Sequence, residues 1–313
     1  MTVLPHKTVN KSHDFDLSRL LSLLPNIERR SYWEDLCPGA TITPQPFGAS
    51  PEFSQDTSRH NQQLREDGYF QTDPILSEAT CLELRRCVEA VLAAGYPPIF
   101  ALVYDGFYRA LADFDPVLCG VLGHSYRLIP NFWVYHIDTN DEARGFEPHR
   151  DAEYPSTLDD SGLPTIVTAW IAVTDATPLN GCMYVLPRGR DPNYPRAVTN
   201  LAEPAVVDAL ENARAIPTRA GSLSCWDQYI VHWGCRSSHW ATAPRISYAV
   251  YFEREDGPSR DPTAFAPPRT LDLADRLGII SKGLLRYSFA GLRDASELAR
   301  LVELADAFAA KSA

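Results

Sequence analysis

The amino-acid sequence predicts a mainly β fold with flanking helices, arranged as an antiparallel sandwich or barrel. Beyond Tyr126 the chain consists of short segments rich in Val, Ile, Tyr and Trp, separated by Pro, Gly and Asn turns. No regular helices lie between these segments, although a parallel sheet would require them. Before Tyr126 and near the C-terminus, apolar residues recur instead at helical spacing. Helices are therefore expected on either side of a β core.

Composition narrows the class of protein and of partner. The 313 residues are 45% hydrophobic and 22% charged, as in a globular protein, and the net charge is −11. This charge disfavours a nucleic acid or an anionic membrane as the main partner. No apolar run reaches the roughly 20 residues that span a bilayer. We expect a small molecule as partner, and the oligomeric state stays open.

The cysteines indicate the redox compartment. There are seven, an odd number, and no two have the CxxC spacing. We therefore expect reduced thiols in a cytoplasmic protein.

We expect three regions: an N-terminal extension (1–60), a core with N-terminal helices (61–260) and a C-terminal helical segment packed on the core (261–313). The extension contains a short amphipathic helix at 17–24, followed by a coil rich in Pro and Gly. This coil is interpreted as a structural strap, with a substrate lid as the alternative.

Helix signals are clearest between residues 60 and 122. A helix ends at Gly68 and runs into a strand, and a second helix begins at Ser77, a good N-cap, and ends at Gly95. Further helices are predicted at 104–111 and from Pro116 towards Leu122.

The strand signals follow. Strands are predicted at 131–137, 166–173, 182–186, 223–226 and 246–252. A helical insertion is expected at 204–214, with C-terminal helices at 270–277 and 294–310.

Two His-x-Asp pairs are candidates for a metal site, His149 with Asp151 and His136 with Asp138. Residues two apart on an extended chain point to the same side, so each pair offers two neighbouring ligands. A further histidine, His232 or His239, would complete a two-histidine, one-carboxylate triad, which leaves open positions on Fe(II). The remaining histidines lie in the extension or lack a nearby carboxylate: His6, His13, His60 and His124.

An arginine near the end of the β region suggests an anion site. Arg245 begins a strong strand, thirteen residues after His232 but only six after His239. Ser247 lies on the same face, so the guanidinium and the hydroxyl can hold one carboxylate together.

Several motifs occur in an order that resembles a known family. They are His149-x-Asp151, Trp170 to Asp175 with Asn180-Gly181-Cys182, Gly221 to Asp227, His232, and Arg245-x-Ser247. This order is similar to that in the phytanoyl-CoA dioxygenase-like (PhyH) branch of the Fe(II)/2-oxoglutarate oxygenases, and the resemblance covers residues 62 to 253. One departure is Pro187-Arg188-Gly189-Arg190, where that branch commonly has Pro-Gly-Ser-His.

The resemblance implies a double-stranded β-helix (jelly-roll) core that binds Fe(II), 2-oxoglutarate and O₂. Iron would be held by His149, Asp151 and His232. The residues expected to contact 2-oxoglutarate are Arg245, Ser247, Trp170, Tyr135 and Asn131. Those expected on the substrate side are Trp133, Arg150, Arg188 and Arg190, with solvated loop residues as the alternative for the last two.

The resemblance also implies the reaction. We expect hydroxylation of an unactivated C–H bond of a small molecule, with succinate and CO₂ as coproducts, in specialised-metabolite biosynthesis. Asp151 favours hydroxylation, desaturation or ring closure over halogenation, because halogenating relatives have a small residue there. The alternatives are a cupin-like metalloenzyme that does not use 2-oxoglutarate, and an inactive jelly-roll binding protein.

Overall fold

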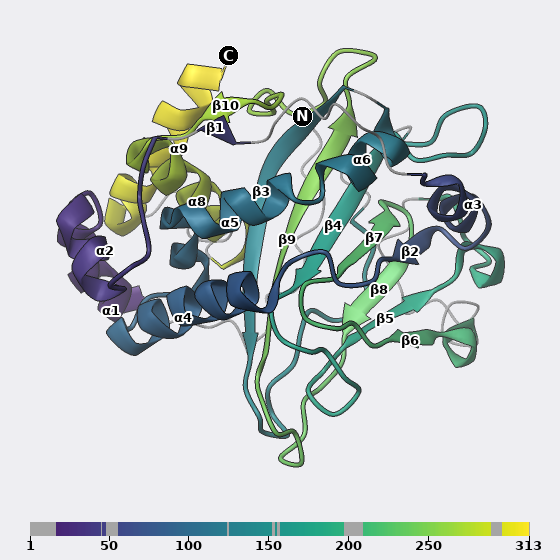
Figure 1. Ribbon diagram of the computed structural model, residues 1–313, viewed down its shortest axis with the longest axis horizontal. Helices are drawn as coiled ribbons and strands as arrows, with labels where there is room; N and C mark the ends of the chain where they lie inside the picture. Colours follow the sequence, from purple (N-terminus) through teal and green to yellow (C-terminus); the bar gives the residue numbers. More distant parts are fainter. Residues whose placement is uncertain are drawn as a thin grey trace.

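Two antiparallel sheets pack face to face, and helices cover the outer face of the larger one (Figure 1). This computed structural model describes residues 17–44, 46–47, 56–123, 125–151, 154, 157–196, 209–288 and 296–312. Within these ranges, no helix is both long and apolar enough to cross a membrane. The expected mainly β fold with flanking helices is confirmed.

The larger sheet has five strands. In spatial order they are β2 (Tyr69–Gln71), β7 (Leu223–Asp227), β4 (Ile166–Ala172), β9 (Arg245–Arg254) and β3 (Tyr126–Ile137). The smaller sheet comprises β6 (Arg214–Ile216), β5 (Met183–Leu186) and β8 (Val231–Gly234). From β7 to β9 the chain alternates between the two sheets, as expected for a jelly roll. A separate two-stranded ribbon pairs β1 (Pro46–Phe47) with β10 (Arg269–Thr270).

Both faces of the larger sheet are buried, which explains its nearly continuous hydrophobic strands. On β4, Val167, Ala169 and Ile171 pack against the helices, whereas Trp170 and Ala172 face the smaller sheet. This division follows from the two-residue period of a strand. It matters for function because only the residues facing the space between the sheets can contribute to an internal pocket.

The helices cover one face and one edge of the larger sheet. They are α1 (Leu17–Leu23), α2 (Arg30–Leu36), α3 (Ser58–Glu66), α4 (Glu78–Ala94), α5 (Asp105–Ala112), α6 (Asp115–Leu122), α8 (Leu273–Tyr287) and α9 (Ala299–Ser312). Short 3₁₀ helices lie at η2 (Leu24–Asn26), η3 (Pro98–Val103), η4 (Arg188–Arg190), η5 (Leu210–Asn212) and η7 (Ser296–Leu298).

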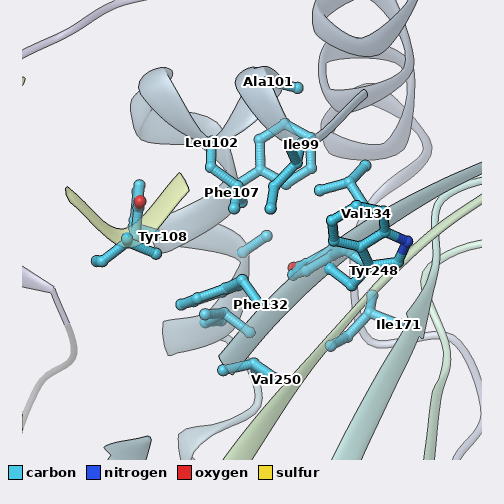
Figure 2. Packing of buried hydrophobic residues seen from close by; sticks show 14 of the residues in the cluster. Ile99, Ala101, Leu102, Phe107, Tyr108, Phe132, Val134, Ile171, Tyr248 and Val250 are labelled. Atoms are coloured by element: carbon cyan, nitrogen blue, oxygen red, sulfur yellow. The ribbon is translucent and has the colours of Figure 1, made fainter. Parts of the chain in front are cut away.

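The main hydrophobic core lies between these helices and the larger sheet. Figure 2 shows Ile99, Leu102 and Phe107 packed over Phe132 and Val250. All five side chains are fully buried. Burying a large apolar side chain contributes about 1.5–3 kcal/mol, so this layer supplies a rigid support for the strands that form the pocket.

Local signals located several elements correctly. Ser77 caps α4 by accepting a hydrogen bond from the Thr80 N–H, and Gly95 ends the helix at φ +94°. The expected strands correspond to β3, β4, β5, β7 and β9. The segment 204–214 was wrongly assigned in part, because residues 210–212 form a 3₁₀ turn and Arg214 begins β6. Its first residues, 204–208, lie outside the described residues, as do His6, His13 and His124.

Candidate active site

Three side chains that could hold a metal ion, referred to below as the three ligands, converge between the two sheets. His149 and Asp151 follow β3, and His232 lies on β8; one ligand atom of each lies within 4.8 Å of the others. The Nε2 atoms of His149 and His232 each lie 3.6 Å from a carboxylate oxygen of Asp151. Two backbone hydrogen bonds between His149 and His232, of 3.0 and 2.9 Å, hold the two ligand segments side by side.

The hydrogen bonds of the two imidazoles determine which nitrogen faces the centre. His149 Nδ1 lies 2.6 Å from the Glu147 carbonyl oxygen, and His232 Nδ1 lies 3.1 Å from that of Ile230. A carbonyl can only accept, so each Nδ1 carries the proton and each Nε2 keeps a lone pair. This tautomer is the one that a metal-binding histidine requires.

Asp151 is held by side chains on two strands of the larger sheet. Its Oδ2 accepts hydrogen bonds from the Thr168 hydroxyl at 2.7 Å and from Trp226 Nε1 at 3.3 Å. Gln228 Nε2 donates to the same hydroxyl at 3.0 Å, so Thr168 can direct its own proton to Asp151. These supporting residues were not identified in the sequence, although Thr168 lies two residues before Trp170 and so shares its face.

Tyr251 is a further neighbour of Asp151 that the sequence did not reveal. Burial and the adjacent carboxylate raise the pKa of Tyr251, and hydrogen bonding to Asp151 and Tyr287 acts in the same direction. Its hydroxyl therefore stays protonated at neutral pH. Tyr251 and Tyr287 both line the pocket beside the three ligands.

Arg245 is a buried guanidinium with no carboxylate partner in the described part of the chain. It is fully buried, and its Nε and Nη2 have no hydrogen-bond partner there. Nη1 lies 3.5 Å from the Ser247 hydroxyl and 3.6 Å from Met183 Sδ. Burial lowers the pKa of Arg245 to about 10, so the group remains charged at neutral pH. A buried cation without a counter-ion is costly, which indicates an anionic ligand.

The surroundings of Arg245 restrict where such a ligand can lie. The guanidinium lies 5.5 Å from the Tyr135 ring centroid and 5.6 Å from that of Trp170. Gly145 and Gly234 cross beside it, and a Cβ on either would lie 2.7–2.8 Å from the backbone of the other. Both positions therefore require glycine for this close approach. Arg245 is itself among the residues that line the pocket.

One pocket contains both the three ligands and Arg245. Its empty volume, which includes open solvent at its mouth, is about 480 Å³. Of the residues predicted from the sequence, those that line it are His149, Asp151, His232, Arg245, Trp170, Tyr135, Asn131 and Trp133. Ser247 lies beneath Arg245, fully buried. The structure thus brings together predicted residues that lie as far apart in the sequence as Asn131 and Arg245, which are 114 positions apart.

Three arginines expected on the substrate side do not line this pocket. Arg150 points away from the ligands on either side of it and forms a buried ion pair with Asp191, whose Oδ1 lies 3.0 Å from Nη2. Arg188 donates to the Gly162 carbonyl at 3.0 Å and stacks on the Tyr194 ring. Arg190 is exposed. Their contacts are structural or with solvent.

The alternative histidines lie elsewhere. His136 pairs with Ile246 across β3 and β9, and directly paired residues share a face of the sheet. Ile246 packs against the helices, so His136 faces away from the pocket. His239 is exposed, and its Nδ1 lies 2.7 Å from Asp141 Oδ2. Among the described residues, only His149, Asp151 and His232 form a group of three potential ligands.

A buried carboxylate near the site gives a pH-dependent prediction. Burial raises the pKa of Asp227 from 3.8 to about 6, despite hydrogen bonds from the Tyr229 N–H and the Tyr194 hydroxyl. Because its pKa is raised in the folded protein, Asp227 binds a proton more tightly there than in the unfolded chain. Its contribution to the free energy of unfolding is fully present below pH 3.8 and is lost as the pH rises through about 6. The loss is on the order of 3 kcal/mol.

We therefore expect Asp227→Asn to flatten the pH dependence of stability. The free energy of unfolding of the variant, measured by urea denaturation between pH 4 and 7, should gain on that of the wild type as the pH rises. All other titrating groups are common to both proteins, so the difference isolates Asp227. Parallel curves would contradict the assignment.

Comparison with known proteins identifies related sequences and folds. Residues 109–239 match the family Phytanoyl-CoA dioxygenase (PhyH). A comparison with curated proteins found no match.

Three solved structures of similar fold have TM-scores of 0.50. The non-heme alpha ketoglutarate dependent carbocyclase SnoK from nogalamycin biosynthesis is 19% identical, with 72% of this chain and 95% of that chain covered. HygX from Streptomyces hygroscopicus, solved with nickel and 2-oxoglutarate bound, is 16% identical, with coverage of 64% and 88%. The nickel complex of the non-heme monooxygenase ThoJ is 17% identical, with coverage of 81% and 99%. At these identities the likeness concerns the fold.

Proposed function

Because the chain belongs to the phytanoyl-CoA dioxygenase (PhyH) family of Fe(II)/2-oxoglutarate-dependent oxygenases, we propose that it hydroxylates an unactivated C–H bond of a small molecule. One observation carries this proposal. A buried, charged arginine without a carboxylate partner among the described residues opens into the same pocket as two histidines and an aspartate.

The donor set fits Fe(II). Two neutral imidazoles and one carboxylate are the ligands of the facial triad, which leaves positions for a bidentate keto acid and O₂. We assign these roles to His149, Asp151 and His232. When bound, iron and 2-oxoglutarate supply the oxidising chemistry, with succinate and CO₂ as coproducts. The chain's own task is to hold the ligands rigidly, and the hydrogen bonds from Thr168 and Trp226 to Asp151 support this task.

Arg245 fits the far carboxylate of 2-oxoglutarate. Its free Nε and Nη2 can donate two parallel hydrogen bonds to one carboxylate, which would neutralise the buried charge. Ser247 lies 3.5 Å from Nη1 and limits the movement of the guanidinium. Tyr135 and Trp170 flank it and exclude water from the pair. A dry environment strengthens the interaction.

The composition of the pocket supports a largely apolar substrate. Among the described residues that line the pocket, Arg245 is the only Arg or Lys, and once paired with a carboxylate it would leave no cation there for the phosphates of an acyl-CoA. Aromatic side chains occupy much of the remaining wall: Trp133, Tyr135, Phe146 and Tyr287. We therefore propose a tailoring step in specialised metabolism. Asp151 occupies the position that a halogenating enzyme would leave open for chloride.

The test is anaerobic addition of Fe(II) and 2-oxoglutarate to the purified protein. Simultaneous chelation should produce the weak visible charge-transfer band of an Fe(II)–keto acid complex, and neither component alone should produce it. Succinate formation on admission of O₂ would then demonstrate turnover. Ser222→Ala changes a buried serine outside the described pocket lining, so this variant should keep the band and controls for the effect of a substitution elsewhere in the core.

The outcomes separate the competing functions. Metal binding without the band would favour a metalloenzyme that uses the ion as a Lewis acid without 2-oxoglutarate. The band without succinate formation, with or without added candidate substrates, would favour a binding protein. Either result would contradict the proposed oxygenase.

A further inference from the structure

A chain of polar side chains connects the pocket with helix α8. Asn131 Nδ2 lies 3.3 Å from the Tyr154 hydroxyl, which in turn lies 3.0 Å from Asp261 Oδ2. Lys282 Nζ, on α8, lies 3.0 Å from the same carboxylate oxygen. Asn131 is 2% exposed and Asp261 8%. The four residues come from four separate segments, so only the tertiary fold brings them together.

The protonation states of these hydrogen-bonded side chains determine the direction of each hydrogen bond. Burial alone would raise the pKa of Asp261, but Lys282 and Thr263 lower it below its ordinary value, so the carboxylate is ionised and only accepts. Burial and the Asp261 charge raise the pKa of Tyr154, so its hydroxyl keeps its single proton. That proton is donated to Asp261. The Tyr154 oxygen is then left as an acceptor.

It follows that the amide of Asn131 has one preferred orientation. Its NH₂ group must face Tyr154, because the opposite orientation would place the amide carbonyl oxygen against the Tyr154 oxygen, and both of these atoms are acceptors. The carbonyl oxygen Oδ1 is consequently directed elsewhere. It is buried and has no hydrogen-bond partner among the described residues, and Asn131 lines the pocket with the three ligands. A buried acceptor without a donor costs about 1–3 kcal/mol.

We propose that Asn131 Oδ1 selects the substrate by accepting a hydrogen bond from a hydroxyl or N–H group, and that Tyr154, Asp261 and Lys282 fix its orientation. The inference rests on the proposed function, since it assigns a role within the same pocket. A carboxylate of 2-oxoglutarate cannot supply this hydrogen bond because it only accepts. Asn131 is thereby assigned to the substrate and not to the cosubstrate.

The neighbouring side chains indicate what carries the donor group. The Trp133 and Tyr287 rings have centroids 5.1 Å apart, and Phe146 lies 6.0 Å from Tyr287 and 5.9 Å from Tyr135. These four rings form a continuous aromatic wall on the pocket. Such a wall favours a flat or ring-bearing molecule, by stacking and by burial of apolar area. The substrate class is therefore a ring system with a hydroxyl or N–H group on one edge.

Two probes of similar size test the acceptor directly. 2-Naphthol donates a hydrogen bond, whereas 2-fluoronaphthalene does not. Their dissociation constants are measured by calorimetric titration, anaerobically with Fe(II) and 2-oxoglutarate and again with the metal-free protein. The wild type should prefer 2-naphthol by about 10- to 100-fold. In Asn131→Leu, which keeps the shape but removes the acceptor, the preference should fall to within about twofold.

Tyr154→Phe tests the positioning role without altering the pocket lining. The variant frees the Asn131 amide to rotate, so the preference should decrease by at least about threefold, while affinity for 2-fluoronaphthalene stays unchanged. Tyr184→Phe removes a hydroxyl from β5. Tyr184 belongs neither to the hydrogen-bonded series from Asn131 to Lys282 nor to the described pocket lining, so this variant should retain the wild-type preference for 2-naphthol. A general loss of packing would weaken the binding of both probes equally, so the ratio of the two affinities would stay at its wild-type value.

Three results would overturn the inference: equal affinities in the wild type, an unchanged preference in Asn131→Leu, or an unchanged preference in Tyr154→Phe. Weaker 2-oxoglutarate binding in Asn131→Leu with the naphthol preference intact would reassign Asn131 to the cosubstrate. Failure of the charge-transfer test would remove the proposed function, but the titrations on metal-free protein would still decide the role of Asn131.

Discussion

Replacement of His149 by alanine is expected to abolish succinate formation. Only three protein ligands are available in the described site, so removal of His149 leaves the metal with two protein ligands. Loss of a residue that merely supports a metal ligand costs about 10- to 100-fold in affinity or activity, so loss of a ligand should exceed 100-fold. The measurements are anaerobic Fe(II) titration and succinate yield.

His136→Ala is the matched control, because it removes the histidine of the other His-x-Asp pair. His136 faces the helices, where burial lowers its pKa and the charges of Glu89 and Arg85 on α4 are nearby. The variant should bind Fe(II) and form succinate as the wild type does. If His136→Ala abolished iron binding and His149→Ala retained it, the metal centre would have to be moved to the upstream pair.

Replacement of Arg245 by alanine is the second change with a large expected effect. The KM for 2-oxoglutarate should rise by about 100-fold or more, since truncation of one partner of a buried charge pair costs 2–5 kcal/mol. The charge-transfer band should be lost at cosubstrate concentrations that saturate the wild type. Iron binding should persist, because Arg245 is not one of the three side chains that could hold the metal.

Thermal stability separates this loss of binding from misfolding. Arg245 has no carboxylate partner among the described residues, so alanine leaves no orphaned protein anion behind. With the metal already present in both samples, addition of 2-oxoglutarate should raise the melting temperature of the wild type further but not that of Arg245→Ala. Arg245→Lys, which keeps the charge but loses the two-pronged donor, should fall between the two. An unchanged KM in Arg245→Ala would show that the cosubstrate carboxylate binds elsewhere.

Local sequence signals were sufficient for much of the fold. Ser77 and Gly95 bound α4 because the cap and the left-handed turn are properties of the residues themselves. The hydrophobic strands were equally visible, since both faces of the larger sheet are buried. Short strands were harder: β8 has only four residues and contains His232, so its periodicity is too brief to be distinguished from a loop.

The ligand types, and the order in which they occur, were already present in the sequence. The His-x-Asp spacing, a later histidine and an arginine with a serine two positions on follow from chemistry and from the two-residue period of a strand. Thr168 and Trp226, which hold Asp151, carried no comparable signal, because a threonine or tryptophan in a strand is ordinary.

Which of the candidate residues act together follows from the tertiary structure. His136 and His149 have the same local pattern, and they differ in the side of the sheet on which each lies. The same contrast holds for three chemically alike arginines. Arg150 pairs with a carboxylate and Arg188 donates to a backbone carbonyl, whereas Arg245 is buried without a carboxylate partner among the described residues. A residue's chemical capability is a property of its side chain, whereas its availability depends on which neighbours the fold supplies. That dependence on neighbours is why the sequence determined the kind of site and the fold determined its members.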